Sequence, residues 1–358
     1  MVLFKRLYLV IMKKLNLFTY HFPYGNQETF LETEIEYLSN EFDKIYIYPR
    51  EYTSHRKRVL PSNVDVVLLK NIKSKLSFGA IANYIQDIFR EKGKRQFAYL
   101  IHLLSYLDYY FYNYEYYQTN KVFFQNKKDE FFYSYWFLDR LLFLSLMKKN
   151  QIITKLYARC HGGDLYDERN GGAIPGRMTN SIYCDRIIPI SLHGKNYLEK
   201  RIKYKDKINF SRLGVEDVGL NSNINDGLFI IVSCSNVIPI KRCELIADFI
   251  SKLSIEISCK WYHFGDGENF DKLINKAQDS NINFEFLGRL PNQDVINFYK
   301  KNSVSLFVNF SLFEGIPVSI MEAMSFGIPI LATDVGGTSE IVIDGGVLLD
   351  KNFEIDKA

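Results

Sequence analysis

Two regions of the chain alternate short apolar runs with amphipathic stretches of helical length. In the first half, apolar runs at 14–22 and 44–49 flank the amphipathic stretch 28–42, which predicts a strand, a helix and a second strand. Strand-like runs return at 155–161 and 185–191. A strand–helix–strand opening of this kind predicts a parallel sheet.

The second half repeats the alternation with more regularity. It follows a segment rich in Asn, Asp and Gly at 215–227, which we interpret as a linker. Short apolar runs between amphipathic helices indicate a doubly wound parallel sheet, in which ligands bind beyond the carboxyl ends of the strands. The predicted strands are 228–234, 258–265, 283–288, 304–310 and 329–334, and the predicted helices are 241–253, 268–279, 294–302 and 317–326.

The stretch 51–150 is less regular and contains basic loops and long aromatic helices without an internal repeat. Its run 131–147 comes closest to a membrane span, but Asp139 and Arg140 interrupt it, so we predict no transmembrane helix. The opening 1–14 resembles a signal peptide only superficially, because charged residues interrupt it and no small-residue cleavage site follows. Met12 is an alternative start.

Length and composition favour a two-domain globular protein. The chain has 358 residues, 47% hydrophobic and 24% charged, which suits two cores and argues against disorder. We place the domains at 1–220 and 221–358. The five cysteines contain no Cys-x-x-Cys pair and are interpreted as reduced thiols of a cytoplasmic protein.

The net charge of +4 hides an asymmetry between the two halves. Lys and Arg exceed Asp and Glu by 12 over residues 1–210, and the acidic residues exceed the basic ones by 8 over 211–358. The basic, aromatic first half suggests peripheral contact with an anionic membrane; a core of aromatics under a solvated basic face is the alternative. Nucleic acid is not an expected partner, since no zinc spacing or RNA-binding aromatic motif accompanies the charge.

The segment 309–337 carries the most informative chemistry. The predicted strand ends before Glu314, and a helix follows whose first turn suits Pro317. Free N–H groups at the start of that helix favour an anion such as a phosphate. Glu314 is then placed to contact a hexose and Glu322 to reach a ribose, with the diphosphate between them. The donor-binding residues expected here are Gly315, Ile316, Pro317, Val318 and Glu322.

This segment resembles the Glu-x(7)-Glu signature of family 4 glycosyltransferases, which have the GT-B fold: two Rossmann-like domains that face each other across a cleft. The matching positions are Glu314, Gly315, Pro317, Glu322, Ala323, Gly327, Pro329 and the run Asp334–Gly337. The resemblance extends over about 12–50, 157–216 and 226–350. It implies further helices after 345–350, so we expect a second domain that lacks its last helices.

Other blocks of the resemblance supply the remaining site residues. Lys241 stands at the position of a lysine that meets the donor diphosphate, where the leaving group gains negative charge. The position of the family's arginine holds Asn236, with Arg242 just beyond Lys241, which leaves open which cation supports the lysine. We include Arg242 among the expected donor-binding residues. Leu290 follows a strand whose loop meets the nucleotide base.

Two blocks in the first half match the family as well. The glycine loop around Gly25 resembles the family's opening loop, which comes close to the donor. His161 ends a strand in a block that resembles Arg-x-His-Gly, and its imidazole is expected to bind the sugar or the acceptor. We assign His161, Lys241 and Glu314 to catalysis.

The resemblance implies a retaining hexosyltransferase that uses a nucleotide sugar as co-substrate, with no metal and no cofactor. The acceptor is expected to be a glycan or a lipid-linked glycan of bacterial surface-polysaccharide synthesis, at the inner face of the membrane. Three alternatives stay open: a nucleotide-sugar epimerase, a glycan phosphorylase on the same fold, and a catalytically idle homologue that acts as a scaffold.

Overall fold

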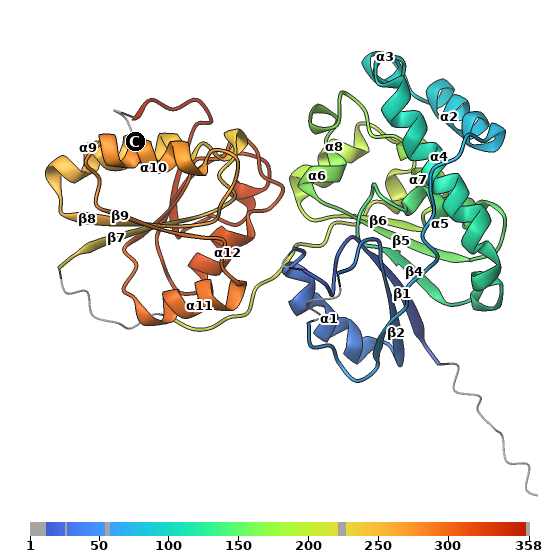
Figure 1. The fold of residues 1–358 in the computed structure, drawn as a ribbon, viewed down its shortest axis with the longest axis horizontal. Helices are drawn as coiled ribbons and strands as arrows, with labels where there is room; N and C mark the ends of the chain where they lie inside the picture. The colour runs from blue at the N-terminus through green and yellow to red at the C-terminus, as the bar shows by residue number, and fades with distance from the viewer. Residues whose placement is uncertain (1–11, 26, 54–57, 221–226, 356–358) are drawn as a thin grey trace, which may run out of the picture. The chain divides into compact units, whose positions relative to one another are not determined.

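The computed structural model describes residues 12–25, 27–53, 58–220 and 227–355 (Figure 1). The signal-like opening 1–11 and residues 221–226 of the expected linker lie outside the described residues. The chain forms two compact units. The first comprises residues up to Ile188 together with Glu199–Asn209, and the second comprises Pro189–Leu198 together with Phe210–Ala358.

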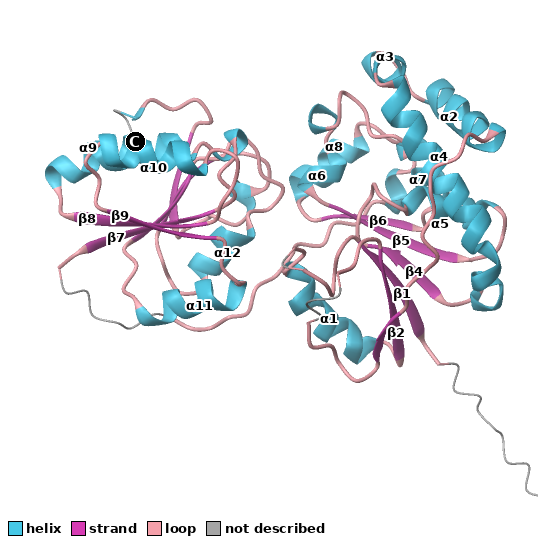
Figure 2. Ribbon diagram, in the orientation of Figure 1, coloured by secondary structure: helices cyan, strands magenta, loops and turns pink. Residues whose placement is uncertain are grey.

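Each unit is built on one six-stranded sheet with helices against it, as Figure 2 shows. The fold class predicted from the sequence, α/β with two doubly wound sheets, is therefore confirmed. The strands of the first sheet, in chain order, are β1 (Lys14–Thr19), β2 (Lys44–Pro49), β3 (Val64–Val66), β4 (Phe131–Ser134), β5 (Lys155–Cys160) and β6 (Arg186–Pro189).

The first sheet has the order β3-β2-β1-β4-β5-β6, and neighbouring strands from β3 to β5 pair in parallel. Its buried core includes Leu17, Leu31 and Ile47, from two strands and the helix between them. The helices of this unit are α1 (Phe30–Glu41), α2 (Phe78–Arg90), α3 (Lys94–Ile101), α4 (Leu103–Asn120), α5 (Leu141–Lys149), α6 (Gly162–Leu165) and α7 (Arg177–Tyr183).

The second sheet has the order β12-β11-β10-β7-β8-β9, and its neighbouring strands pair in parallel. Its strands are β7 (Phe229–Cys234), β8 (Cys259–Phe264), β9 (Phe284–Gly288), β10 (Leu306–Asn309), β11 (Ile330–Thr333) and β12 (Gly346–Leu349). The helices are α8 (Leu192–Glu199), α9 (Cys243–Glu256), α10 (Phe270–Asp279), α11 (Asn292–Lys301) and α12 (Val318–Met324).

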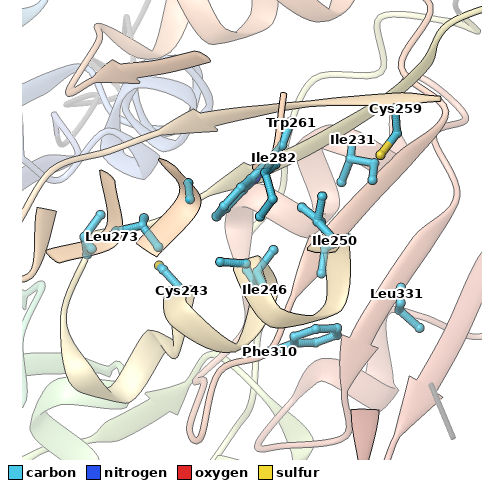
Figure 3. Packing of buried hydrophobic residues seen from close by; sticks show 14 residues of the cluster. Ile231, Cys243, Ile246, Ile250, Cys259, Trp261, Leu273, Ile282, Phe310 and Leu331 are labelled. Carbon is cyan, nitrogen blue, oxygen red and sulfur yellow. The ribbon is translucent and has the colours of Figure 1, made fainter. Parts of the chain in front are cut away.

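Apolar side chains on both faces of the second sheet explain its continuous apolar strands. On one face, Trp261 of β8 packs with Ile246 and Ile250 of α9 and with Phe310 (Figure 3). On the other face, Phe264 and Phe307 pack with Ile320 of α12. A strand that is covered on both faces has no polar side, which is why these runs lack the alternation of a half-exposed strand.

The middle of the first unit differs from its sequence-based description. The expected long aromatic helices are present in α2 to α4, but the apolar run 131–147 divides into β4 and α5. Asp139, with a φ of 63°, and Arg140 lie in the connection between them. No helix in the described ranges is long and apolar enough to cross a membrane.

Candidate functional site

The second sheet changes direction between β7 and β10, and the loops after these two strands hold the candidate site. From β7 the chain adds β8 and β9 on one side and then returns to add β10 on the other. At such a switch point the loops at the carboxyl ends separate and leave room for a ligand. The β7 loop ends at Lys241, and the β10 loop carries Glu314. A backbone bond from Leu312 N to Ile240 O, at 2.8 Å, ties the two loops together.

Lys241 and Glu314 form a salt bridge in this loop pair. The Nζ of Lys241 lies 2.5 Å from Oε1 of Glu314, and the glutamate side chain is largely buried. Ser311 Oγ donates to the same oxygen at 2.7 Å, and Asn309 Nδ2 lies 3.4 Å from it. Among the described residues, all bonds to this carboxylate use Oε1, so Oε2 is the oxygen left to accept a hydrogen bond from a ligand.

Glu322, eight residues later, projects from α12 and is buried. Burial raises the pKa of its carboxyl group to about 7, and a hydrogen bond from Asn292 Nδ2, 2.7 Å from Oε1, opposes the rise. Asn292 is the first residue of α11, so the pair joins the helices that follow β9 and β10. A carboxyl group with this pKa accepts or donates a hydrogen bond near neutral pH.

The expected anion-binding stretch from Gly315 to Val318 lies beside the loop that follows β11. Gly337 N donates to Gly315 O at 2.9 Å. Gly336 has a φ of 60°, and a Cβ built there would lie 1.9 Å from Glu314 O. Gly315 N and Ile316 N donate to no acceptor within the described ranges. The diglycine therefore lets one loop support the backbone of the other while these N–H groups stay available.

The guanidinium group of Arg289 lies beside Asn236, the residue at the position where the resemblance led us to expect an arginine. Arg289, directly after β9, donates from Nη2 to Asn236 Oδ1 at 3.1 Å and from Nε to Asp266 Oδ1 at 2.9 Å. The loops after β7, β8 and β9 thus meet at one side chain. Arg289 is 44% exposed, and none of the described residues binds its Nη1. Leu290 follows it and is partly exposed.

Arg242 occupies a different environment from Lys241. Its backbone is left-handed, with a φ of 48°, and its guanidinium donates to Phe310 O at 2.6 Å and to Lys351 O at 2.8 Å. Burial lowers its pKa. The side chain thus holds the end of β10 to the segment after β12, and no bond joins it to Glu314 in the described structure.

Two glycines and a histidine ring support the loops of this unit. Gly265, with a φ of 134°, would place a Cβ 1.9 Å from Ser235 O, and Gly267 would place one 2.4 Å from Val237 O. His263 is fully buried, its Nδ1 lies 2.7 Å from Ser233 Oγ, and burial lowers its pKa to about 4. The segment 263–269 therefore packs tightly against the loop that follows β7.

In the first unit, Gly25 lies in the loop after β1 with a φ of 64°, and nothing stands within 4 Å of its built Cβ. Glu28 fixes this loop: its carboxylate accepts from the backbone N–H groups of Tyr20, His21 and Phe22 and from Trp136 Nε1 at 2.6 Å. Trp136 follows β4, which neighbours β1 at the switch point of the first sheet. The loop is anchored at both ends while Gly25 stays open.

His161 ends β5 and lies among aromatic rings. Its centroid is 4.5 Å from that of Trp136 and 5.2 Å from that of Phe30. Its Nε2 lies 3.1 Å from Tyr135 O, so this nitrogen carries the proton and donates it. Burial, together with the charge of Arg159, lowers its pKa to about 3, so the ring is neutral at physiological pH.

The sequence analysis did not identify three residues of the site as binding residues. Arg289 precedes Leu290 and was given no role of its own, Asn292 follows a turn proline, and Ser311 is an ordinary loop serine. Only the structure shows what they contact: Arg289 binds residues of two other loops, Asn292 binds Glu322 of another helix, and Ser311 binds Glu314 within its own loop. Among the described residues, no group of three or more His, Cys, Asp or Glu side chains is arranged to hold a metal ion.

Comparisons with known proteins agree with this geometry. Residues 220–358 match the family described as "Glycosyl transferases group 1". The chain is 30% identical over 213 residues to "Uncharacterized glycosyltransferase MJ1178" of Methanocaldococcus jannaschii, covering 57% of this chain and 56% of that protein. It is 38% identical over 116 residues to "O-antigen biosynthesis glycosyltransferase WbnH" of Escherichia coli, covering 32% and 31%. The matches thus span about half and about a third of these relatives.

Solved structures extend the likeness to nearly the whole chain. The apo form of the lipopolysaccharide outer core galactosyltransferase WaaB has a TM-score of 0.62 at 16% identity and covers 96% of this chain and 87% of its own. Anabaena Alr3699/HepE in complex with UDP-glucose has a TM-score of 0.61 at 13% identity and covers 96% of this chain and 87% of its own. The chain therefore has the GT-B fold, and residues 220–358, within its second unit, match the family model of group 1 glycosyl transferases.

Proposed function

We propose that this protein transfers a hexose from a nucleotide-sugar donor to a glycan or lipid-linked acceptor, with retention at the anomeric carbon. The observation that carries the proposal is the Lys241–Glu314 salt bridge at the switch point of the second sheet. Lys241 and Ser311 hold Oε1 of Glu314, so the free oxygen is kept in one orientation. A preorganised carboxylate of this kind binds a sugar hydroxyl without reorganising during the reaction.

The donor diphosphate is assigned to the cations and N–H groups around this pair. Lys241 and Arg289 come from the edges of the β7 and β9 loops, and both present N–H donors that suit phosphate oxygens. Gly315 N and Ile316 N add neutral donors. The sequence left open which cation supports Lys241 at the diphosphate, and we assign that role to Arg289.

Glu322 and Asn292 are assigned to the ribose of the nucleotide. The Glu322 carboxyl has one oxygen free of the Asn292 bond, and burial strengthens any hydrogen bond that it makes. Leu290 is partly exposed after Arg289, and its backbone is assigned to the base. His161 and Gly25 are assigned to the sugar or the acceptor.

In the proposed reaction, the bond between the anomeric carbon and the phosphate oxygen breaks, and the nucleoside diphosphate leaves with the electron pair. Lys241 and Arg289 stabilise the negative charge that develops on it. The acceptor hydroxyl attacks the same face of the sugar, and its proton passes to the departing phosphate oxygen. No second carboxylate is required for a double displacement, in contrast to a retaining glycosidase.

The acceptor class rests on the relatives. Two of them are named for O-antigen biosynthesis and one for the lipopolysaccharide outer core. We assign this protein to the same kind of work, the assembly of a bacterial surface polysaccharide.

The experiment is a survey of donor breakdown by the full chain. UDP-, GDP- and ADP-sugars are incubated with the protein, first with water alone and then with bacterial glycolipid extract, and the nucleoside diphosphate released is measured by chromatography. We expect one donor to be consumed, faster with acceptor. Proton NMR of the sugar first transferred to water should show the anomeric configuration of the donor, and the opposite anomer would contradict retention.

Matched variants separate the site from the fold. Glu314→Ala and Lys241→Ala remove the salt bridge of the site, and Glu285→Ala and Lys260→Ala remove an exposed Lys–Glu pair of the same unit. We expect loss of turnover only from the first pair. Interconversion of the sugar without release of nucleotide would instead favour the epimerase, a requirement for inorganic phosphate would favour the phosphorylase, and no turnover of any donor by folded protein would favour the idle scaffold.

A further inference from the structure

The helix α2 is amphipathic with its two faces reversed relative to those of an ordinary surface helix. Its buried face carries Asn83, Tyr84 and Asp87. Its solvent face carries Phe78 and Phe89, which are 91% and 79% exposed, together with Ile85. A surface helix normally buries its apolar stripe and exposes its polar one.

Hydrogen bonds fix this orientation of α2. The buried carboxyl of Asp87 accepts from Tyr110 at 2.6 Å and from Thr179 at 2.7 Å, and Arg90 pairs with it at 3.3 Å. Tyr84 donates to the backbone carbonyl of Tyr99. Rotating the helix to bury its phenylalanines would break these bonds and leave a buried carboxylate unpaired, so the exposed apolar face is built into the unit.

The helix α3 and the start of α4 continue the exposed apolar surface. Phe97, Leu100, Ile101 and Leu104 follow the spacing of one helical face, and Ile101 and Leu104 are 76% and 83% exposed. Single exposed apolar residues are ordinary, but a group of this size marks an interaction surface.

The exposed stripes of α2 and α3 belong to one helical layer, which lies together in Figure 1. The buried sides of α2, α3 and α4 pack on a common cluster that includes Ala80, Ala98 and Tyr106. The stripes therefore lie on the outside of that layer. We call them the α2–α3 surface, which consists of Phe78, Ile85, Phe89, Phe97, Leu100, Ile101 and Leu104.

The charges of residues 68–105, which carry the α2–α3 surface, are mostly positive, and the exposed Asp108 follows one helical turn after Leu104. Between residues 68 and 105 the chain has seven Lys and Arg residues, and its two acidic residues, Asp87 and Glu91, are buried. Arg90 and Arg95 pair with these two, and Lys75 pairs with Glu115. The remaining lysines are exposed and have no carboxylate partner among the described residues: Lys70, Lys73, Lys92 and Lys94.

We propose that the α2–α3 surface docks on a membrane that contains anionic phospholipids. Phe, Leu and Ile side chains that stand out from helices enter the boundary between headgroups and acyl chains, and lysines beside them attract anionic headgroups. The absence of exposed carboxylates from this stretch matches the charge of such a membrane. The proposal concerns the first unit alone and does not depend on which sugar or acceptor the protein uses.

The experiment is co-sedimentation of the full chain with vesicles of phosphatidylcholine alone and with about a third phosphatidylglycerol, at low and at high salt. We expect binding to the anionic vesicles, weakened by salt because the attraction is screened. The variant F89S/L104S should lower the affinity about tenfold or more, and K92E/K94E should lower it on anionic vesicles. Equal binding of all proteins, or none by the wild type, overturns the proposal.

A matched control removes exposed apolar side chains from the other unit. Ile255 and Ile343 are 84% and 74% exposed there, and I255S/I343S should bind vesicles as the wild type does. Size-exclusion chromatography without lipid tests the competing occupant. A wild-type dimer that F89S/L104S converts to monomer, with no vesicle binding by either, would assign the surface to a second copy of this chain and reject the membrane. Nucleotide release by F89S/L104S in detergent should match the wild type, which keeps this test separate from the transfer reaction.

Discussion

Arg289 donates a hydrogen bond to Asn236 across 3.1 Å, between the loop after β9 and the loop after β7. Asn236 stands where the resemblance led us to expect an arginine, and the guanidinium of Arg289 arrives beside it from another loop. Asp266, from the loop between them, orients it. A residue 53 positions after Asn236 thus brings a positive charge to the loop that also carries Lys241.

Replacing Arg289 should weaken binding of the diphosphate without weakening binding of the nucleoside. We expect Arg289→Ala to lower the affinity for the nucleoside diphosphate about tenfold, which is typical of a charge-assisted hydrogen bond, and Arg289→Lys to restore part of it. Calorimetric titration with the diphosphate and with the nucleoside measures both. An equal loss for the two ligands would place Arg289 at the base or in loop structure instead.

Lys241 and Glu314 should behave as one unit. Each alanine substitution should lower turnover about a hundredfold or more, because each leaves its partner misplaced. The double variant K241A/E314A should then be little worse than the poorer single variant, since residues in direct contact are not additive. A double-mutant cycle on nucleotide release measures the coupling, and fully additive losses would mean that the two residues act separately.

Gly336 should be intolerant of any side chain. Its positive φ and the 1.9 Å approach of a built Cβ to Glu314 O mean that Gly336→Ala must displace the loop that carries Glu314. We expect a fall in turnover of about tenfold or more and a stability loss of about 1–3 kcal/mol. Gly214→Ala, where nothing lies within 4 Å of the built Cβ, is the matched control. Similar thermal melting and turnover for both variants would contradict the assigned packing.

Glu322 should make the free protein less stable as the pH rises. Its pKa is about 7 in the folded chain and near 4.5 when unfolded, so between these values the folded state binds more protons. The free energy of unfolding therefore falls through this range, by about 3 kcal/mol at most. Glu322→Gln removes the titration, so the variant should match the wild type at pH 5 and exceed it at pH 8.

The pH series is read as the difference between wild type and Glu322→Gln in thermal denaturation. Taking the difference cancels other groups, such as Asp164 in the first unit, whose pKa burial also raises to about 7. A constant difference from pH 5 to pH 8 would show that Glu322 does not titrate in this range. With nucleotide bound, the free energy of unfolding should instead rise with pH, because the ribose hydroxyls are proposed to donate to the ionised carboxylate of Glu322.

His161 should remain neutral throughout the physiological range. Burial and Arg159 lower its pKa to about 3, and the unfolded value is about 6.5, so the stability from its neutral form is present above pH 6.5 and is lost as the pH falls. The NMR signal of its imidazole carbon Cε1 should not shift between pH 5 and pH 8. A titration near 6.5 would contradict the buried position.

The regular parts of the fold could be predicted because apolar runs on a sheet covered on both faces are visible in the sequence. β2 occupies the predicted range 44–49, and each strand from β7 to β11 falls within its predicted run. β4 was hidden because it lies with α5 in one apolar stretch that only Asp139 and Arg140 interrupt, and β3 has only three residues. Periodicity does not separate a short buried strand from a buried helix.

The candidate site was predictable to the extent that single loops carry it. Glu314, Glu322 and Lys241 stand in recognisable strings, whereas Arg289 and Asn292 act through partners on other loops, which only the register of the sheet brings together. Arg242 was chosen for its position next to Lys241, but adjacent residues point in different directions when the backbone of one is left-handed. We now assign it to holding Phe310 and Lys351.

The central claim is that the second unit binds a nucleoside diphosphate through Lys241. The most direct measurement is calorimetric titration of the full chain with UDP, GDP and ADP, repeated with Lys241→Ala and with the control Lys260→Ala, which removes a lysine that pairs with Glu285 instead of Glu314. We predict that one nucleotide binds, that Lys241→Ala weakens it about tenfold or more, and that Lys260→Ala leaves it unchanged. No binding of any of the three, or equal binding by all three proteins, would contradict the claim.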